Sequence, residues 1–234
     1  MKPTAIILAA GVGRRFGDAL AEKPKALLEV AGETLIGRLV RQLRAAGVSE
    51  IVVVGGYGVE HLHAALPADV EILLNPDFRR GAILSLYTAR AYLDRAVLIM
   101  DADVFGPDEM IARLVESKHE NCFLFDGTAE ATGEEQMLHA CGERIRDIAR
   151  NPRGEYDFLG ESVGFLKLSA EAAPVMLEFL EQRVAAGEVD LEHEEVYPDF
   201  LARVDTGFER VDDLQWTEVD FPEDLERARS LADR

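Results

Sequence analysis

The chain has 234 residues, of which 48% are apolar and 29% are charged, and this is the composition of a globular protein with enough apolar side chains for a sizeable core. Its formal net charge of −19 argues against general nucleic-acid binding, because the phosphate backbone requires a basic surface. No stretch approaches the roughly 18 uninterrupted apolar residues that span a bilayer, so membrane insertion is not expected.

The N-terminal segment is apolar, but it lacks the features of a signal peptide. Residues 11–15 read G-V-G-R-R and end the apolar run early, and no cleavage-site pattern follows. We therefore interpret residues 6–9 as a first buried strand and expect a cytoplasmic protein. The two cysteines, Cys122 and Cys141, are too few for a disulfide framework or a zinc site, and we expect two reduced, buried thiols.

Short apolar runs alternate with segments of helical spacing through the first hundred residues. Strands are expected at residues 6–9, 51–54, 70–73 and 96–100, and helices at residues 34–46, 59–66 and 85–93. This alternation predicts an α/β fold with a doubly wound, mostly parallel sheet and helices on both faces. Gly11, Gly56 and Asp103 follow expected strands, at the edge where such sheets place their functional sites.

The second half is less regular. Strands are expected at residues 122–126 and 162–168 and a helix at residues 171–186, whereas the weak periodicity of residues 127–160 indicates a hairpin or a lid. No repeat, low-complexity tract or flexible linker is present, which favours a single domain.

The clearest motif is L-A-A-G-V-G-R-R at residues 8–15, followed by Pro24-Lys25. Gly11 and Gly13 allow backbone N–H groups to approach phosphates, and Arg15 and Lys25 supply positive charge. A glycine-rich turn without a ligand is the alternative interpretation. Two other nucleotide motifs are excluded, because Phe16 breaks G-x-G-x-x-G and no G-K-[ST] follows.

Two groups of carboxylates form the second motif. Asp101 and Asp103 follow the strand at residues 96–100, and carboxylates there can hold a hard divalent cation that bridges phosphate oxygens. Glu218 and Asp220 lie on the same side of a short extended segment before Pro222, which is a favourable first residue for a helix. Turn or helix-capping acids are the alternative interpretation of Asp101 and Asp103.

These motifs together resemble the nucleotidyltransferase superfamily of MobA-like and sugar-phosphate enzymes. The ending W-T-E-V-D-F-P-E-D-L at residues 216–225 resembles its phosphocholine, aminoethylphosphonate and inositol-phosphate cytidylyltransferase branch. Shorter matches, G-Y at 56–57, N-P at 75–76, S-L-Y at 85–87 and E-S-V-G at 161–164, extend the resemblance along the chain. It implies one Rossmann-like, GT-A-like nucleotidyltransferase domain over residues 1–234, with an NTP-binding half at 1–120 and an acceptor-binding half at 121–234.

The resemblance also implies an activity: a Mg²⁺- or Mn²⁺-dependent enzyme that transfers CMP from CTP to a small phosphorylated or phosphonylated acceptor and releases pyrophosphate. The implied catalytic residues are Arg15, Lys25 and Asp103. The implied nucleotide-binding residues are Leu8, Ala9, Ala10, Gly11, Gly13, Arg15, Lys25, Gly56, Ser85 and Asp101. The implied metal ligands are Asp103 and Asp220, with Glu218 as an outer ligand. The implied acceptor-binding residues are Arg150, Glu161, Gly164, Glu192 and Glu194.

Departures from the family pattern leave alternatives open. Residues 192–195 read E-H-E-E where choline-handling relatives have Tyr-Tyr-Glu-Asp, so an acceptor other than phosphocholine is expected, unless this run is only a solvated face. Residues 81–84 read G-A-I-L where many relatives have Asn-Asn. A sugar-1-phosphate uridylyl- or guanylyltransferase and a non-catalytic nucleotide sensor remain the competing functions.

The expected partners are small molecules, and a homodimer is compatible with the sequence. The five histidines show neither triad nor metal-ligand spacing, and we interpret them as surface or structural residues: His61, His63, His119, His139 and His193.

Overall fold

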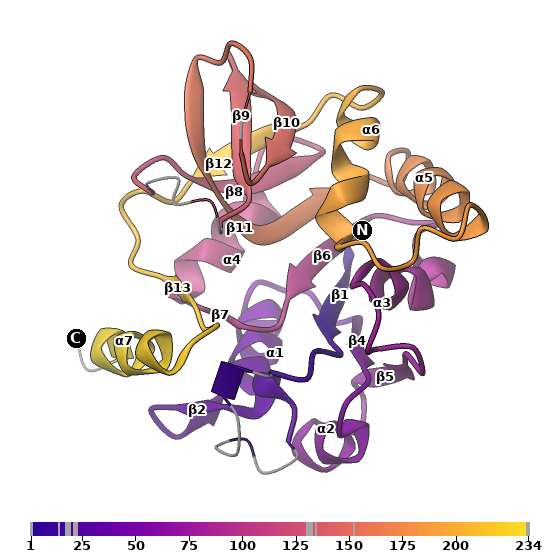
Figure 1. Ribbon diagram of the computed structural model, residues 1–234. Coiled ribbons are helices and arrows are strands. Elements are labelled where there is room, and N and C mark those ends of the chain that lie inside the picture. The colour runs from indigo at the N-terminus through magenta and orange to yellow at the C-terminus, as the bar shows by residue number, and fades with distance from the viewer. Residues whose placement is uncertain are drawn as a thin grey trace.

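The computed structural model describes residues 2–13, 15–16, 20, 23–129, 133, 135–151 and 153–232. Figure 1 shows the order of the elements. The strands are β1 (Thr4–Ala9), β2 (Glu29–Val30), β3 (Glu33–Thr34), β4 (Ile51–Gly55), β5 (Glu71–Leu74), β6 (Val97–Asp101), β7 (Val104–Phe105), β8 (Cys122–Asp126), β9 (Met137–Cys141), β10 (Arg144–Ala149), β11 (Phe158–Leu168), β12 (Gly207–Arg210) and β13 (Thr217–Glu218). The α-helices are α1 (Leu35–Ala45), α2 (Val59–Ala65), α3 (Ile83–Thr88), α4 (Asp108–Glu116), α5 (Ala173–Ala185), α6 (Tyr197–Leu201) and α7 (Pro222–Ala232), and the 3₁₀ turns include η2 (Lys25–Leu27), η3 (Arg90–Tyr92) and η4 (His193–Val196).

One large sheet forms the centre of a single domain. Its strands β6, β1, β4 and β5 lie side by side and run parallel, which confirms the parallel sheet expected for the first half. The long strand β11 then pairs antiparallel with β6, with β8 and with β9. Strand β11 therefore joins the strands of the two halves of the chain into one sheet.

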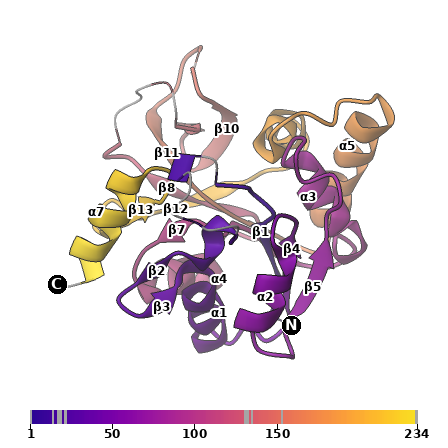
Figure 2. The same cartoon turned by 60° about the horizontal axis from the view of Figure 1, so that its bottom comes forward.

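Alternating apolar residues of the parallel strands pack against different helices. On β1, Ala5 and Ile7 belong to the core that contains α1 and α4, whereas Ile6 belongs to the core that contains α3 and α5. The figures agree: α1 and α4 lie on one side of the sheet and α3 and α5 on the other (Figure 2). The helices on both faces leave the carboxyl ends of β1, β4 and β6 as the open edge of the sheet.

Several element predictions are corrected. The single helix expected at residues 85–93 is wrong, because α3 begins at Ile83 and ends at Thr88, whose hydroxyl donates to the Leu84 carbonyl, and the separate turn η3 follows. Helix α4 and strand β12 were not predicted, and β11 begins earlier than expected. Within the segment expected to be a hairpin or a lid, β9 and β10 form a hairpin over residues 137–149, which projects from the sheet at the top of Figure 1.

Both cysteines are unpaired, as expected, but only Cys122 is buried; Cys141 is partly exposed, because it ends β9 at the hairpin turn. Burial raises the pKa of the Cys122 thiol to about 11. None of the helices in the described part of the chain is long and apolar enough to cross a membrane.

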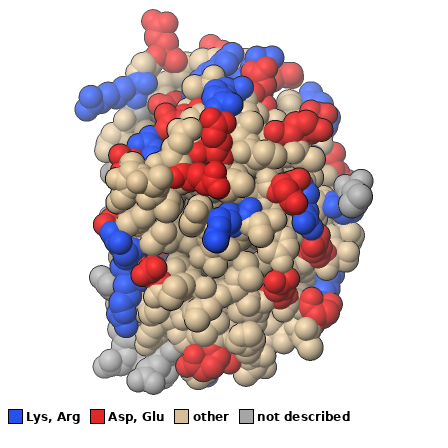
Figure 3. Space-filling model, turned by 90° about the vertical axis from the view of Figure 1, so that its right-hand side faces the viewer, with Lys and Arg blue, Asp and Glu red and all other residues tan. Residues whose placement is uncertain are grey.

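On the face drawn in Figure 3, carboxylates and basic groups are interspersed. Ion pairs such as Arg183 with Asp199 and Glu188 compensate part of the negative charge locally.

Candidate active site

A cleft of about 550 Å³ opens where the carboxyl ends of β1 and β6 meet β11, β13 and η4. Nearly all the residues predicted for the site lie in its wall: Leu8, Ala9, Ala10, Gly11, Gly13, Arg15, Lys25, Ser85, Asp101, Asp103, Arg150, Glu161, Gly164, Glu192, Glu194, Glu218 and Asp220. Gly56 is the exception. It lies behind the wall, where a side chain would overlap Phe78 and come within 3.0 Å of the Ala10 Cβ atom, so its glycine permits close packing of β4 against the loop after β1.

The loop after β1 forms one side of the cleft. Gly13 has a φ of +63°, and a Cβ atom there would lie 2.5 Å from the Leu20 side chain and 3.1 Å from the Lys25 Cβ atom. Only glycine therefore allows the loop to lie against Lys25 in this conformation. Around Gly11 the space within 4 Å of a would-be Cβ atom is free of described atoms, so this backbone is open to a ligand.

Two basic side chains and three carboxylates lie together beside this loop: Lys25, Arg15, Asp103, Glu218 and Asp220. The Lys25 Nζ atom lies 2.5 Å from Asp103 Oδ2 and 2.5 Å from Asp220 Oδ1, and Arg15 lies 2.5 Å from the other Asp220 oxygen. Strand β13 brings Asp220 here, because it pairs with β7 and the Val219 N–H donates to the Asp103 carbonyl. Residues from both ends of the chain thus form one cluster, in which Asp103 and Asp220 both contact Lys25.

The electrostatics of this cluster are strongly coupled. Burial lowers the pKa of Lys25, but the charges of Asp103 and Asp220 outweigh it and hold the pKa above its usual value. Burial raises the pKa of Asp220, whereas Lys25 and Arg15 lower it, and the net direction is down. Loss of hydration and the charges of Asp103 and Asp220 raise the pKa of Glu218 well above its usual range.

The same carboxylates fit a hard divalent cation. Oxygens of Asp103, Glu218 and Asp220 lie within 4.8 Å of one another. The buried Asp103 Oδ1 atom has no hydrogen-bond partner in the described part of the chain, so it has a free coordination direction. An all-oxygen donor set is the one that Mg²⁺ prefers.

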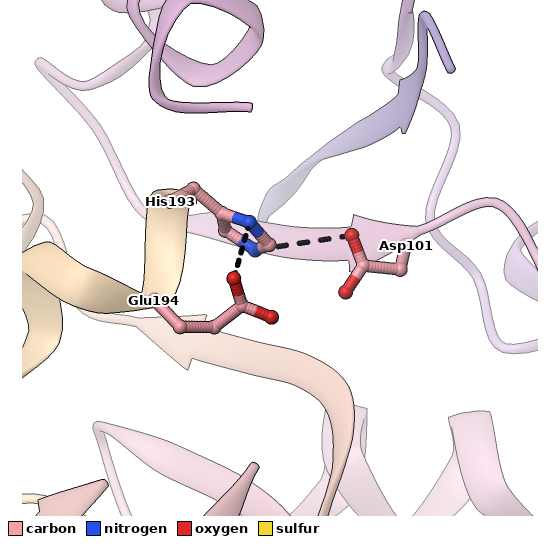
Figure 4. Close-up of side chains that lie close together, drawn as sticks. All are labelled: Asp101, His193 and Glu194. Carbon is pink, nitrogen blue, oxygen red and sulfur yellow. Dashed lines mark ion pairs between the residues drawn. The ribbon is translucent and has the colours of Figure 1, made fainter. Parts of the chain in front are cut away.

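A second cluster lies deeper in the cleft (Figure 4). The His193 ring is 3% exposed; its Nε2 atom faces Asp101 Oδ1 at 3.8 Å and its Nδ1 atom faces Glu194 Oε2 at 2.9 Å, in an ion pair without the geometry of a directed hydrogen bond. Burial lowers the pKa of His193, but Glu194 and Asp101 outweigh it and raise the pKa to about 10. Because each carboxylate faces a different ring nitrogen, the arrangement suits an imidazolium and not a metal ion, which would bind only one nitrogen.

His193 is buried and lines the cleft, so its interpretation as a surface residue is wrong, whereas a structural role agrees with its burial. Because Glu192, Glu194 and Glu195 surround it in the sequence, the pattern indicates a solvent-exposed segment, and the burial of His193 could not be predicted from it. One signal was available: Glu192 and Glu195 have the spacing of a capping box, and in the structure each side chain bonds the other's backbone N–H around η4. Glu192 and Glu195 therefore both cap η4, and of the two only Glu192 also lines the cleft, together with Glu194.

The remaining predicted acceptor residues come mainly from β11 and the hairpin. Burial, followed by the charges of Glu135 and Asp126, raises the pKa of Glu161 to about 7. Gly164 has a φ of +79° next to an irregular register of β11, and a Cβ atom there would lie 2.5 Å from Asp101 Oδ2. Its glycine therefore lets β11 approach the end of β6.

Ser85 lines the cleft and is itself buried. Its hydroxyl accepts a hydrogen bond of 3.0 Å from the buried Asn75 side chain, and Asn75 Oδ1 in turn accepts from the Asp77 N–H. The N-P and S-L-Y motifs, whose residues Asn75 and Ser85 are 10 positions apart, thus form one buried polar contact.

The model of the MobA-like NTP transferase domain matches residues 5–163. The chain belongs to this family. The MobA-like match includes the glycine-containing loop, Lys25, Asp103 and Glu161, and it ends before His193 and Asp220, which the structure brings to the same cleft.

Relatives of this NTP transferase match almost the whole chain. It is 30% identical over 234 residues to a bifunctional IPC transferase and DIPP synthase of Thermococcus kodakarensis; the alignment covers 97% of this chain but only 50% of that protein, so this chain spans about half of its length. It is 29% identical to a 2-aminoethylphosphonate cytidylyltransferase of Lancefieldella rimae, with 96% and 91% of the two chains covered.

The fold of this MobA-like chain is also that of solved structures. The CTP:phosphocholine cytidylyltransferase of Streptococcus pneumoniae superposes with a TM-score of 0.81 at 21% identity, over 99% of this chain and 100% of that one.

Proposed function

We propose that this protein is a cytidylyltransferase that transfers CMP from CTP to a small acceptor carrying a phosphate or phosphonate, with release of pyrophosphate. The observation that carries the proposal is the cluster of Lys25, Arg15, Asp103 and Asp220 beside the glycine-containing loop of an NTP transferase. The Lancefieldella relative, named as a cytidylyltransferase, supports CTP as the donor.

The cation in this proposal is Mg²⁺, with Mn²⁺ as a substitute, held by Asp103, Asp220 and Glu218. When bound, it neutralises charge on phosphate oxygens of the nucleotide. The chain's own contribution is to position the reactants: the loop at Gly11 holds the triphosphate with backbone N–H groups, and Lys25 and Arg15 offset its negative charge.

The reaction needs no nucleophile from the protein. An oxygen of the acceptor phosphate forms a new bond to the α-phosphorus of CTP, the bond from that phosphorus to the β-phosphate oxygen breaks, and pyrophosphate leaves with its electron pair. The attacking oxygen is already anionic, so no protein base is required. Catalysis then consists of positioning and charge neutralisation. Lys25 is placed for this role because its side chain, 15% exposed, lies at the centre of the cluster.

The carboxylates in the part of the cleft wall formed by β6, β11 and η4 support an acceptor with a primary amine or hydroxyl groups. Asp101, Glu161, Glu192 and Glu194 line that wall, and the described lining residues include no Phe, Tyr or Trp. A quaternary ammonium is recognised by aromatic faces and cannot donate hydrogen bonds, whereas amines and hydroxyls can donate to carboxylates. An aminoalkyl phosphonate or phosphate therefore fits better than phosphocholine.

The test is a matrix of donors and acceptors with pyrophosphate release as the readout. CTP, UTP, GTP and ATP are each combined with 2-aminoethylphosphonate, phosphoethanolamine, inositol phosphate, phosphocholine and glucose 1-phosphate. We expect kcat/KM to be at least tenfold higher with CTP, and higher for the amine or hydroxyl acceptors than for phosphocholine. Preference for UTP or GTP with glucose 1-phosphate would show a sugar-phosphate enzyme instead, and nucleotide binding without pyrophosphate release from any pair would indicate a sensor.

A further inference from the structure

The segment that leads into His193, residues 189–191, is hydrogen-bonded to the first half of the chain, at Gly81 and Ile83. The Gly81 N–H donates to the Val189 carbonyl at 3.0 Å and the Ile83 N–H to the Leu191 carbonyl at 3.1 Å. A Cβ atom at Gly81 would overlap the Leu191 backbone, so the close approach requires glycine at this position. The chain that leads into η4 is therefore anchored to the start of α3 immediately before His193.

The ring is also fixed on its other sides. Tyr197 of α6 contacts it edge-on, with ring centroids 5.5 Å apart. Asp101, the last residue of β6, belongs to the nucleotide half, and Glu194 belongs to the acceptor wall. His193 thus lies between a carboxylate of each half, and Glu192 is the other acid close enough to affect its charge.

This position matters because of the charge in the cleft. An acceptor phosphate must enter a wall that carries Asp101, Glu192 and Glu194, and uncompensated carboxylates at close range repel an anion. A cationic ring between Asp101 and Glu194 offsets that repulsion and orients both carboxylates by ion pairs. Arg150, also in the cleft wall, is exposed and its charge acts on Glu192 and Glu194, whereas His193 is buried between Asp101 and Glu194.

We propose that His193 is a positioning residue for the acceptor: as an imidazolium it joins Asp101 to Glu194, holds the Glu194 carboxylate in the wall where it meets the acceptor's polar group, and offsets negative charge that would repel the acceptor's phosphate. This role rests on the proposed function. It is a property of the acceptor subsite and not of the nucleotide subsite, and this distinction makes it testable.

The kinetic experiment compares His193→Gln with His139→Gln. His139 is also a buried histidine, 4% exposed, but it lies on β9 against Tyr156 and does not line the cleft, so its replacement controls for the loss of a buried ring. For His193→Gln we expect the KM for the acceptor to rise at least tenfold while the KM for CTP stays within twofold. His139→Gln should leave both KM values unchanged.

A double-mutant cycle with Glu194→Gln tests whether His193 acts through that carboxylate. The double variant should be no more impaired in acceptor KM than the worse single variant, because the ion pair is already broken in each. Additive effects would contradict the pairing. If His193→Gln lowers the melting temperature but changes neither KM, its role is merely structural and the proposal is wrong.

A second readout does not depend on activity. In ¹⁵N-histidine-labelled protein at pH 8, both nitrogens of His193 should show the chemical shifts of protonated imidazolium, with His193→Gln used to assign the signal. A neutral His193 ring would contradict the proposed imidazolium link between Asp101 and Glu194, even if the enzyme is active. If the wild-type protein releases no pyrophosphate with any substrate pair but the ring is protonated, the proposed function is wrong, whereas the link from Asp101 through His193 to Glu194 is supported.

Discussion

Replacement of Asp103 by Asn removes one charge and keeps the side-chain shape. One Asp103 oxygen contacts Lys25 at 2.5 Å, and the other is buried without a hydrogen-bond partner among the described residues. Lys25 keeps its second contact, with Asp220, and the repulsion within the three-carboxylate cluster falls. We therefore expect the free energy of unfolding to change by no more than about 1 kcal/mol, as for a partly exposed pair.

The effect on catalysis should be far larger. Loss of a group that stabilises charge in the transition state costs roughly 3–4 kcal/mol, which corresponds to a fall in kcat of about 10²–10³-fold. The assay is pyrophosphate release with CTP and the best acceptor at saturating Mg²⁺, with urea unfolding measured in parallel.

A matched control lies on the adjacent helix. Asp108→Asn makes the same chemical change at the start of α4, where the carboxylate contacts Arg41 and Gln42 outside the cleft. It should lose up to about 1 kcal/mol of stability and retain full activity. An Asp103→Asn enzyme with more than a tenth of the wild-type kcat/KM would refute the assignment of Asp103 to the metal.

Four further changes have definite expected outcomes. Lys25→Ala should reduce kcat as well as raise the KM for CTP, with a total loss of about 3 kcal/mol in transition-state stabilisation, and a change in KM alone would show that Lys25 only binds. Excess EDTA should abolish pyrophosphate release and added Mg²⁺ should restore it; full activity in EDTA would exclude the metal mechanism. Gly164→Ala, which places a methyl group against Asp101, should lower kcat/KM at least tenfold, and this is checked with the same assay. Trp216→Phe, which removes the 2.8 Å indole hydrogen bond to buried Asp126, should lower the free energy of unfolding by about 1–3 kcal/mol in a urea titration.

The first half of the fold was predictable because buried parallel strands and amphipathic helices have distinct patterns. The run at residues 51–54 is continuous and apolar, and α1 begins after Thr34, whose side chain accepts from the Gly37 N–H. Helix α4 was missed although Pro107 and Asp108 provide a start signal and Met110, Ile111 and Leu114 have helical spacing, so the sequence did carry a pattern for it. Strand β12 had no such signal: it is a strand of four residues whose partner β8 lies far away in sequence.

The residues of the candidate site likewise differ in how far the sequence could predict them. Residues grouped in motifs, such as Gly13 and Lys25, were found because their chemistry and spacing are local. His193 was missed because its burial depends on contacts with Asp101 and Tyr197, which only the folded chain brings together. For the same reason the sequence could not separate the cleft-lining Glu194 from the capping Glu195.

The contacts of Asp220 also bear on how the protein is made. Its ion pairs with Lys25 and Arg15 join residues 195 and 205 positions apart, whereas every ladder of the nine-stranded sheet is complete with residues up to Arg210. A ribosome delivers the N-terminal residues first, so the sheet can pair before the segment with Glu218 and Asp220 has been synthesised. The sheet is thus encoded ahead of Glu218 and Asp220, so a nascent chain acquires these two carboxylates only after every strand of the nine-stranded sheet has been synthesised.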